Sequence, residues 1–148
     1  MSTLTAPSKS SKTTLMMTEN WLRTVFPSEL YKIEQRAAFE DSDGEQPPAL
    51  VVTRNAEQVP VLVIEVSDAP IAEYPGDESG RFAASGVRDY WVIEVVARRL
   101  HAHRDPQPDA DAKHGSNYKQ VRAFSPNALI SPLAAELHLA QVINLLPW

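Results

Sequence analysis

The run PVLVIEV, residues 60–66, tells more about the fold of this 148-residue chain than any other stretch. It is apolar and rich in β-branched residues, and it does not alternate with polar ones, which is typical of a strand buried on both faces. Only Glu65 interrupts it. The runs YWVIEVV, residues 90–96, and ALVV, residues 49–52, have the same character. We therefore expect three buried strands in one sheet.

The segments around these runs predict the remaining elements. In chain order they are a helix from Thr18 to the residue before Pro27, a half-buried strand from Tyr31, a loop over 41–48, a helix over 77–85 closed by Gly86, a strand over 99–103, a polar loop over 105–116, an edge strand over 117–124 and a helix over 140–146. This order favours an α/β fold with one central, mixed, twisted sheet flanked by helices. We expect residues 1–17 to be a disordered tail and residues 18–148 to form a single domain.

The composition excludes some kinds of site and partner. The chain has no cysteine, which rules out disulfides, zinc–thiolate sites and a cysteine nucleophile. No apolar run approaches the roughly 18 residues that cross a bilayer, and no signal peptide is evident, so we expect a cytoplasmic protein without a membrane partner. The formal net charge is −5 and the basic residues are scattered, which gives no support to nucleic acid as a partner.

Glu65 is the candidate functional residue that physical chemistry alone identifies. A carboxylate inside an apolar strand is costly to bury unless it is paired, hydrogen-bonded or bound to a metal. Metal-dependent hydrolases use such a group because the strand fixes its direction while a cation neutralises it. The alternatives are a solvent-facing edge of the sheet or an ion pair with an arginine. The strand alone leaves these readings open.

A longer pattern adds to this reading. The residues from VIEVSD (63–68) through FAASGVRDYWV (82–92) keep the spacing of a signature without a gap. They resemble the Uma-type putative restriction endonucleases, small bacterial proteins of the PD-(D/E)XK nuclease superfamily. The resemblance covers residues 20–146 and implies a restriction-endonuclease-like fold. It also implies phosphodiester hydrolysis with Mg²⁺, held by two acids on adjacent strands and assisted by a lysine.

Residue by residue, the resemblance gives this chain only part of the implied catalytic set. The second acid falls on Glu65 and is retained. The first acid falls on Ala49 and the lysine on Glu78, so that one carboxylate is lost and one charge is reversed. An aspartate and a tyrosine of the pattern fall on Tyr74 and Phe82. The mapping predicts that residues 49, 65 and 78 lie close together.

These losses predict weak or absent Mg²⁺ binding, since this ion usually needs two protein carboxylates or help from a phosphate. A metal site rebuilt from Glu65 with Asp68, Asp77 or Glu78 is the competing expectation. Three functions remain: an impaired nuclease-fold protein that acts by binding, a divergent Mg²⁺-dependent DNA endonuclease that uses Glu65 with relocated acids, and a structural subunit beside an intact paralogue. We expect no metal-dependent cleavage of duplex DNA.

Three further side chains invite weaker hypotheses. His101 and His103 point to the same side of a strand, where they either bind a metal or pack, and no third ligand is evident. Trp148 follows a proline at the end of the sequence given. A large aromatic side chain in this position predicts packing in a homodimer interface.

Overall fold

A six-stranded sheet forms the centre of the part of the chain that the computed structural model describes, residues 7–41, 44–69 and 77–148. The strands lie in the order β1-β4-β5-β6-β7-β8, with the bounds β1 Tyr31–Arg36, β4 Ala49–Arg54, β5 Leu62–Ser67, β6 Asp89–Glu94, β7 Arg99–Pro108 and β8 Ser116–Phe124. β5 and β6 are parallel, and the other neighbours are antiparallel. The predicted mixed sheet is confirmed, and so are its three buried strands.

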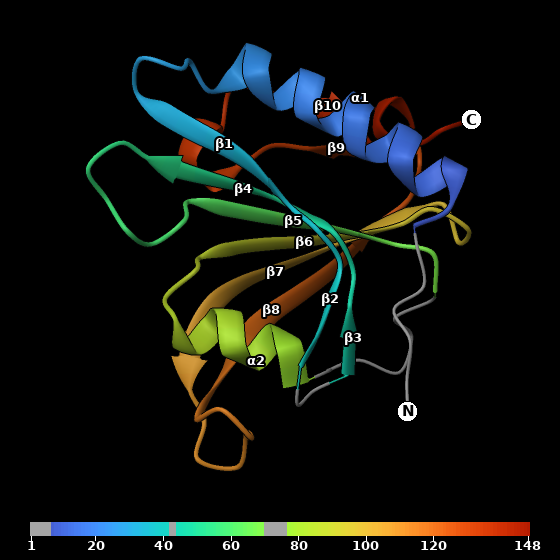
Figure 1. The fold of residues 1–148 in the computed structure, drawn as a ribbon. Helices are drawn as coiled ribbons and strands as arrows, with labels where there is room; N and C mark the ends of the chain where they lie inside the picture. Colours follow the sequence, from blue (N-terminus) through green and yellow to red (C-terminus); the bar gives the residue numbers. More distant parts are fainter. Residues whose placement is uncertain (1–6, 42–43, 70–76) are drawn as a thin grey trace.

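The two α-helices of the described residues cover opposite faces of this sheet, as Figure 1 shows. α1 (Lys9–Val25) lies along one face, and α2 (Asp77–Ala84) lies against the other, in the chain segment that joins the parallel strands β5 and β6. β5 contributes Leu62, Ile64 and Val66 to the core beneath α1, and Val63 to the smaller core beneath α2. Burial on both faces therefore explains why this run is apolar apart from Glu65.

The first helix begins earlier than predicted, so the expectation of a disordered tail over residues 1–17 is wrong for residues 9–17, while residues 1–6 lie outside the described part of the chain. Ser8 caps the helix, and residues 9–17 are its first turns. The buried stripe of α1 contains Ser11, Thr14 and Thr18 among its apolar members, so the sequence pattern of an amphipathic helix is masked by hydroxyl groups. None of the described helices is long and apolar enough to cross a membrane.

Two predicted loops are shorter than expected because strands extend into them. The segment 41–48 includes part of a small hairpin of β2 (Phe39–Asp41) and β3 (Gly44–Gln46). β7 runs on to Pro108 and β8 starts at Ser116, past a bend at Asp105, where φ is +60°. Acidic residues and prolines hid both extensions, since they are depleted in strands.

Of the predicted C-terminal helix over 140–146, only residues 142–145 are helical, and they form a 3₁₀ helix. The chain there forms the short pair β9 (Leu129–Ile130) and β10 (Ala140–Gln141), with the 3₁₀ turns η1 (Leu133–Ala135) and η2 (Val142–Leu145). The segment is too short and too close to Pro147 to extend a regular helix. It closes the core beneath α1 through Val142, Leu145 and Leu146.

Candidate functional site

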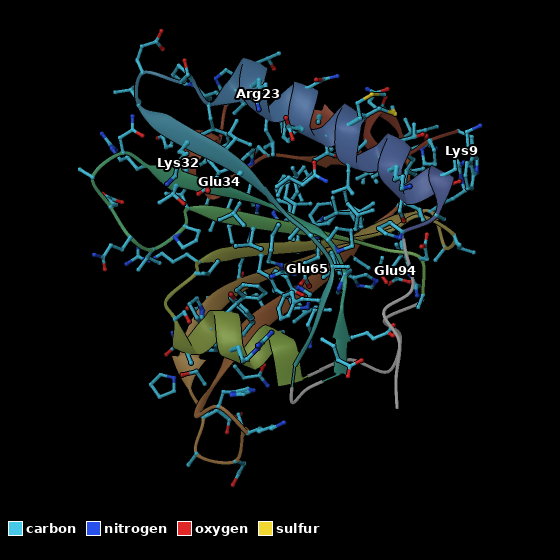
Figure 2. All side chains as sticks on the ribbon, in the orientation of Figure 1. Lys9, Arg23, Lys32, Glu34, Glu65 and Glu94 are labelled. Carbon is cyan, nitrogen blue, oxygen red and sulfur yellow. The ribbon has the colours of Figure 1, made fainter. Side chains whose placement is uncertain are left out.

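Glu65 lies in the middle of β5, with 1% of its surface exposed. Its neighbours Ile64 and Val66 belong to the core beneath α1, so strand alternation directs Glu65 to the α2 side. Figure 2 shows it near the centre of the sheet. The alternative of a solvent-facing edge is therefore excluded, and the carboxylate needs partners inside the protein.

A row of three residues crosses the sheet at this level. Arg36 in β1 lies opposite Ala49 in β4, and Ala49 lies opposite Glu65 in β5. Directly opposed residues have Cβ atoms about 5 Å apart and share one face. Because Ala49 carries only a methyl group, the Arg36 side chain extends past it and places Nη2 2.7 Å from Glu65 Oε2. The arginine ion pair, one of the alternatives for Glu65, is the arrangement found.

The other carboxylate oxygen of Glu65 is also engaged. The Tyr90 hydroxyl, from the neighbouring strand β6, donates a hydrogen bond to Oε1. Tyr90 is itself 1% exposed, and its ring packs on Phe82 of α2 with centroids 4.8 Å apart. The hydroxyl and the guanidinium thus each bind one oxygen, and together they stabilise the buried charge.

The guanidinium of Arg36 has other contacts besides the ion pair with Glu65. Nη2 also donates to the Pro47 carbonyl at 2.8 Å. Its Cζ lies 4.7 Å from the ring centre of Phe39 and 5.9 Å from that of Phe82. The Arg36 side chain is 26% exposed. These contacts hold the guanidinium between aromatic rings and a backbone carbonyl. Because the side chain is already ordered there, it loses little conformational entropy when it binds the carboxylate.

The described residues of this site do not fit a magnesium ion. Mg²⁺ prefers octahedral oxygen coordination and usually takes one or two free carboxylates. Each oxygen of Glu65 already accepts a hydrogen bond from a protein group, and Ala49, directly opposite, offers no ligand. Across the described part of the chain, no group of three His, Cys, Asp or Glu side chains is arranged to hold a metal ion.

Asp68, which we expected as a candidate ligand, is directed elsewhere. Its Oδ1 accepts a hydrogen bond from the Ser11 hydroxyl at 2.6 Å, and its Oδ2 accepts one from the Ser8 backbone N–H at 3.0 Å. Partial burial pushes the pKa of Asp68 upward, but these bonds outweigh it and leave the pKa below its usual value. The residue closes the N-terminus of α1, so the structure does not bring it to Glu65.

The other predicted site positions lie on α2. Asp77 and Glu78 form its first turn, and their side chains lie outside the described residues, as does Tyr74. Phe82 faces the sheet from the same helix, beside Tyr90. Ala49 therefore lies next to Glu65 as the mapping predicts, while α2 covers the same face of the sheet. The roles assigned to residues 49, 65 and 78 remain predictions.

A second buried acid occupies the same face. Glu94 of β6 is 1% exposed, and its Oε1 lies 2.5 Å from His101 Nε2 and 3.3 Å from Arg99 Nε. The sequence carries for Glu94 the same signal as for Glu65, a lone acid in an apolar strand. Arg99 and His101 both belong to the next strand, and the Arg99 guanidinium supplies the positive charge opposite Glu94.

The predicted histidine pair does share one side of β7, but each ring has a protein partner. His101 binds Glu94, whereas His103 donates Nδ1–H to the Tyr90 carbonyl at 3.2 Å. The His103 ring also lies against those of Tyr90 and Tyr118. Burial, with a smaller contribution from the charge of His101, lowers the pKa of His103 to about 4. His103 is therefore a neutral packing residue at physiological pH.

On the opposite face of the sheet, beneath α1, Asp89 forms hydrogen bonds to several elements. The sequence alone did not reveal this role. The Asp89 carboxylate is fully buried and accepts hydrogen bonds from Trp91 Nε1 at 2.7 Å, Arg104 Nε at 2.9 Å and the Leu133 backbone N–H at 2.9 Å. Burial raises the pKa of Asp89, although Arg104 and the other donors act in the opposite direction. The segment DYW, residues 89–91, thus stabilises one face through Asp89 and the other through Tyr90.

Two comparisons place this architecture among known proteins. A structure of a putative nuclease belonging to DUF820 from Anabaena variabilis ATCC 29413 superposes with a TM-score of 0.65 and 13% sequence identity. The match covers 94% of this chain and 81% of that one, and at this identity it shows the fold alone. No curated protein matches the chain. The model of the Uma2 family, described as putative restriction endonuclease, matches residues 3–142. The buried strand around Glu65, the DYW segment and this match over nearly the whole chain lead to one conclusion: the protein belongs to the Uma2 family of restriction-endonuclease-like proteins.

Proposed function

We propose that this Uma2-family protein is a catalytically impaired nuclease-fold protein that acts by binding rather than by cleaving phosphodiesters. The observation that carries the proposal is that protein groups bind both carboxylate oxygens of Glu65. Its Oε2 is bound by Arg36 and its Oε1 by Tyr90, and the strand position opposite holds Ala49. A nuclease that depends on a divalent cation needs carboxylate oxygens free to bind it.

The charge of the chain supports a protein as the bound partner. The formal net charge is −5, and two basic residues of the site face are paired with buried acids: Arg36 with Glu65, and Arg99 with Glu94. A surface that binds nucleic acid mainly through phosphates needs basic groups free to contact them. The proposal therefore expects duplex DNA to bind no more tightly than non-specifically, with Kd on the order of 10⁻⁶ M or weaker at physiological salt.

The test is a cleavage assay on the purified full chain. Supercoiled plasmid, linear duplex and single-stranded DNA are incubated with Mg²⁺ or Mn²⁺ beside the Glu65→Gln variant, and fluorescence anisotropy of a labelled duplex measures binding. We expect equal, background-level cleavage for both proteins. Reproducible cleavage by the wild-type protein that Glu65→Gln abolishes would overturn the proposal in favour of a divergent endonuclease.

A further inference from the structure

We propose that the Arg36 guanidinium is a built-in replacement for a divalent cation at Glu65 and blocks a metal site that the backbone still supports. This inference rests on the proposed function, since it gives a cause for the absence of metal-dependent cleavage. It differs from that proposal in what it claims: the occupant of the site is a side chain of this protein, and that side chain can be exchanged.

The first argument is position. Arg36, Ala49 and Glu65 are in register on three adjacent strands and face the same side of the sheet. An acid at position 49 would have its Cβ about 5 Å from that of Glu65, close enough for two carboxylates to bind one cation. The Arg36 guanidinium reaches Glu65 from beyond position 49, so its charge lies near the space that such a cation would fill.

The second argument is the size of residue 49. Ala49 is completely buried, in the core formed with Val63, Ala83 and Tyr90. A longer side chain there would stand between Arg36 and Glu65. The methyl group therefore does two things at once: it removes a metal ligand, and it leaves room for the arginine.

The third argument is electrostatic. A buried carboxylate without a counter-charge carries a large desolvation cost. A fold that loses a cation at Glu65 must supply another one or neutralise the acid. Arg36 supplies that charge, and the contacts of its guanidinium with Pro47 and Phe39 hold it in place. The site thus carries its own positive charge and does not depend on a dissolved ion.

The decisive experiment compares metal binding by three variants. Ala49→Asp restores the second carboxylate but keeps the guanidinium. Ala49→Asp with Arg36→Gln restores the carboxylate and removes the positive charge. Ala49→Asp with Arg36→Lys is the matched control, which keeps a cation at position 36. Mn²⁺ is titrated into each full-length protein by calorimetry, and circular dichroism follows folding in EDTA and in Mn²⁺.

We expect the Arg36→Gln double variant to bind Mn²⁺ at least ten times more tightly than either protein that keeps a cation at position 36. The inference is supported equally if the Ala49→Asp, Arg36→Gln protein is unfolded in EDTA and folds when Mn²⁺ is added. Equal affinities, or equal lack of binding, in all three proteins would overturn it. So would an Ala49→Asp, Arg36→Gln protein that stays unfolded at saturating Mn²⁺. DNA cleavage by the wild-type protein would instead refute the proposed function, so the two failures are distinguishable.

Discussion

Arg36 and Glu65 form an ion pair across an intervening strand, with Nη2 and Oε2 2.7 Å apart above the methyl group of Ala49. The carboxylate is buried and the guanidinium is partly exposed. Without the guanidinium, the buried charge of Glu65 would be uncompensated, which would destabilise the folded protein. The resemblance drawn from the sequence predicts a metal-binding acid at Glu65, and here protein groups balance the charge of that acid.

The Tyr90 hydroxyl is the second partner of that carboxylate. We predict that Tyr90→Phe lowers the free energy of unfolding by about 1.5–3 kcal/mol, because it removes a buried hydrogen bond to a charged group. Tyr118→Phe is the matched control, since it removes a buried hydroxyl that donates to a neutral carbonyl, that of Val87, at 2.6 Å. The control should cost about 1 kcal/mol. Urea denaturation measures both, and an equal loss in the two variants would contradict the role assigned to Tyr90.

Asp89 should be the most sensitive acid outside the site. Asp89→Ala leaves Arg104 and the Leu133 N–H without their buried acceptor, and we expect a loss of about 3–5 kcal/mol in unfolding free energy. Asp111→Ala, an exposed acid in the loop before β8, should change stability by less than about 0.5 kcal/mol. Thermal denaturation of the two variants checks this. A loss at Asp89 no larger than the loss at Asp111 would refute the network.

The buried histidine predicts a pH dependence of stability. The pKa of His103 falls from 6.5 to about 4 on folding, so between these values the unfolded chain binds a proton that the folded chain does not. Stability contributed by this residue is therefore present above pH 6.5 and is lost as the pH falls toward 4, by an amount on the order of 3 kcal/mol. Urea denaturation from pH 4.5 to 7.5, with His103→Gln as reference, measures the difference. Parallel curves for the two proteins would show that His103 does not titrate in this way.

The contact between Asp68 and the start of α1 predicts a capping effect. Asp68→Ala removes the acceptor for Ser8 and Ser11 and a negative charge at the helix N-terminus. We expect a loss of about 1 kcal/mol in unfolding free energy, and faster hydrogen exchange in the first turn of α1 than the wild-type protein shows there. Glu19→Ala is the control, because this acid forms a helix-surface ion pair with Arg23 and should cost less than about 0.5 kcal/mol. Unchanged exchange in the Asp68 variant would remove the capping role.

The sequence predicted the parts of the fold whose signal is local. The runs around Glu65 and Tyr90 are apolar except for one acid each, because both faces of β5 and β6 are covered. This pattern is visible in the sequence of each strand alone. The start of α1 was missed because Ser11 and Thr14 occupy buried positions in which an apolar residue is expected. The β2–β3 hairpin was missed because its residues are mostly polar.

The candidate site also has one part that the local sequence predicts and another part that it does not. The burial of Glu65 follows from its own strand, whereas its pairing with Arg36 depends on β1 lying beside β4 in one particular register. Such a register is set by tertiary packing, and no feature of the sequence around Arg36 fixes it. Glu94 could have been found by the reasoning applied to Glu65, since it is also a lone acid in a buried strand. Its partners Arg99 and His101 follow closely in the hairpin.

The most direct test of the account is the coupling energy between Arg36 and Glu65, measured by urea denaturation of Arg36→Met, Glu65→Gln and the double variant. We expect Arg36→Met alone to cost about 3–5 kcal/mol because it leaves a buried carboxylate without its cation. The double variant should recover most of that loss, giving a coupling of at least about 2 kcal/mol. Additive single losses, within about 0.5 kcal/mol, would contradict the claim that Arg36 is the counter-ion of Glu65.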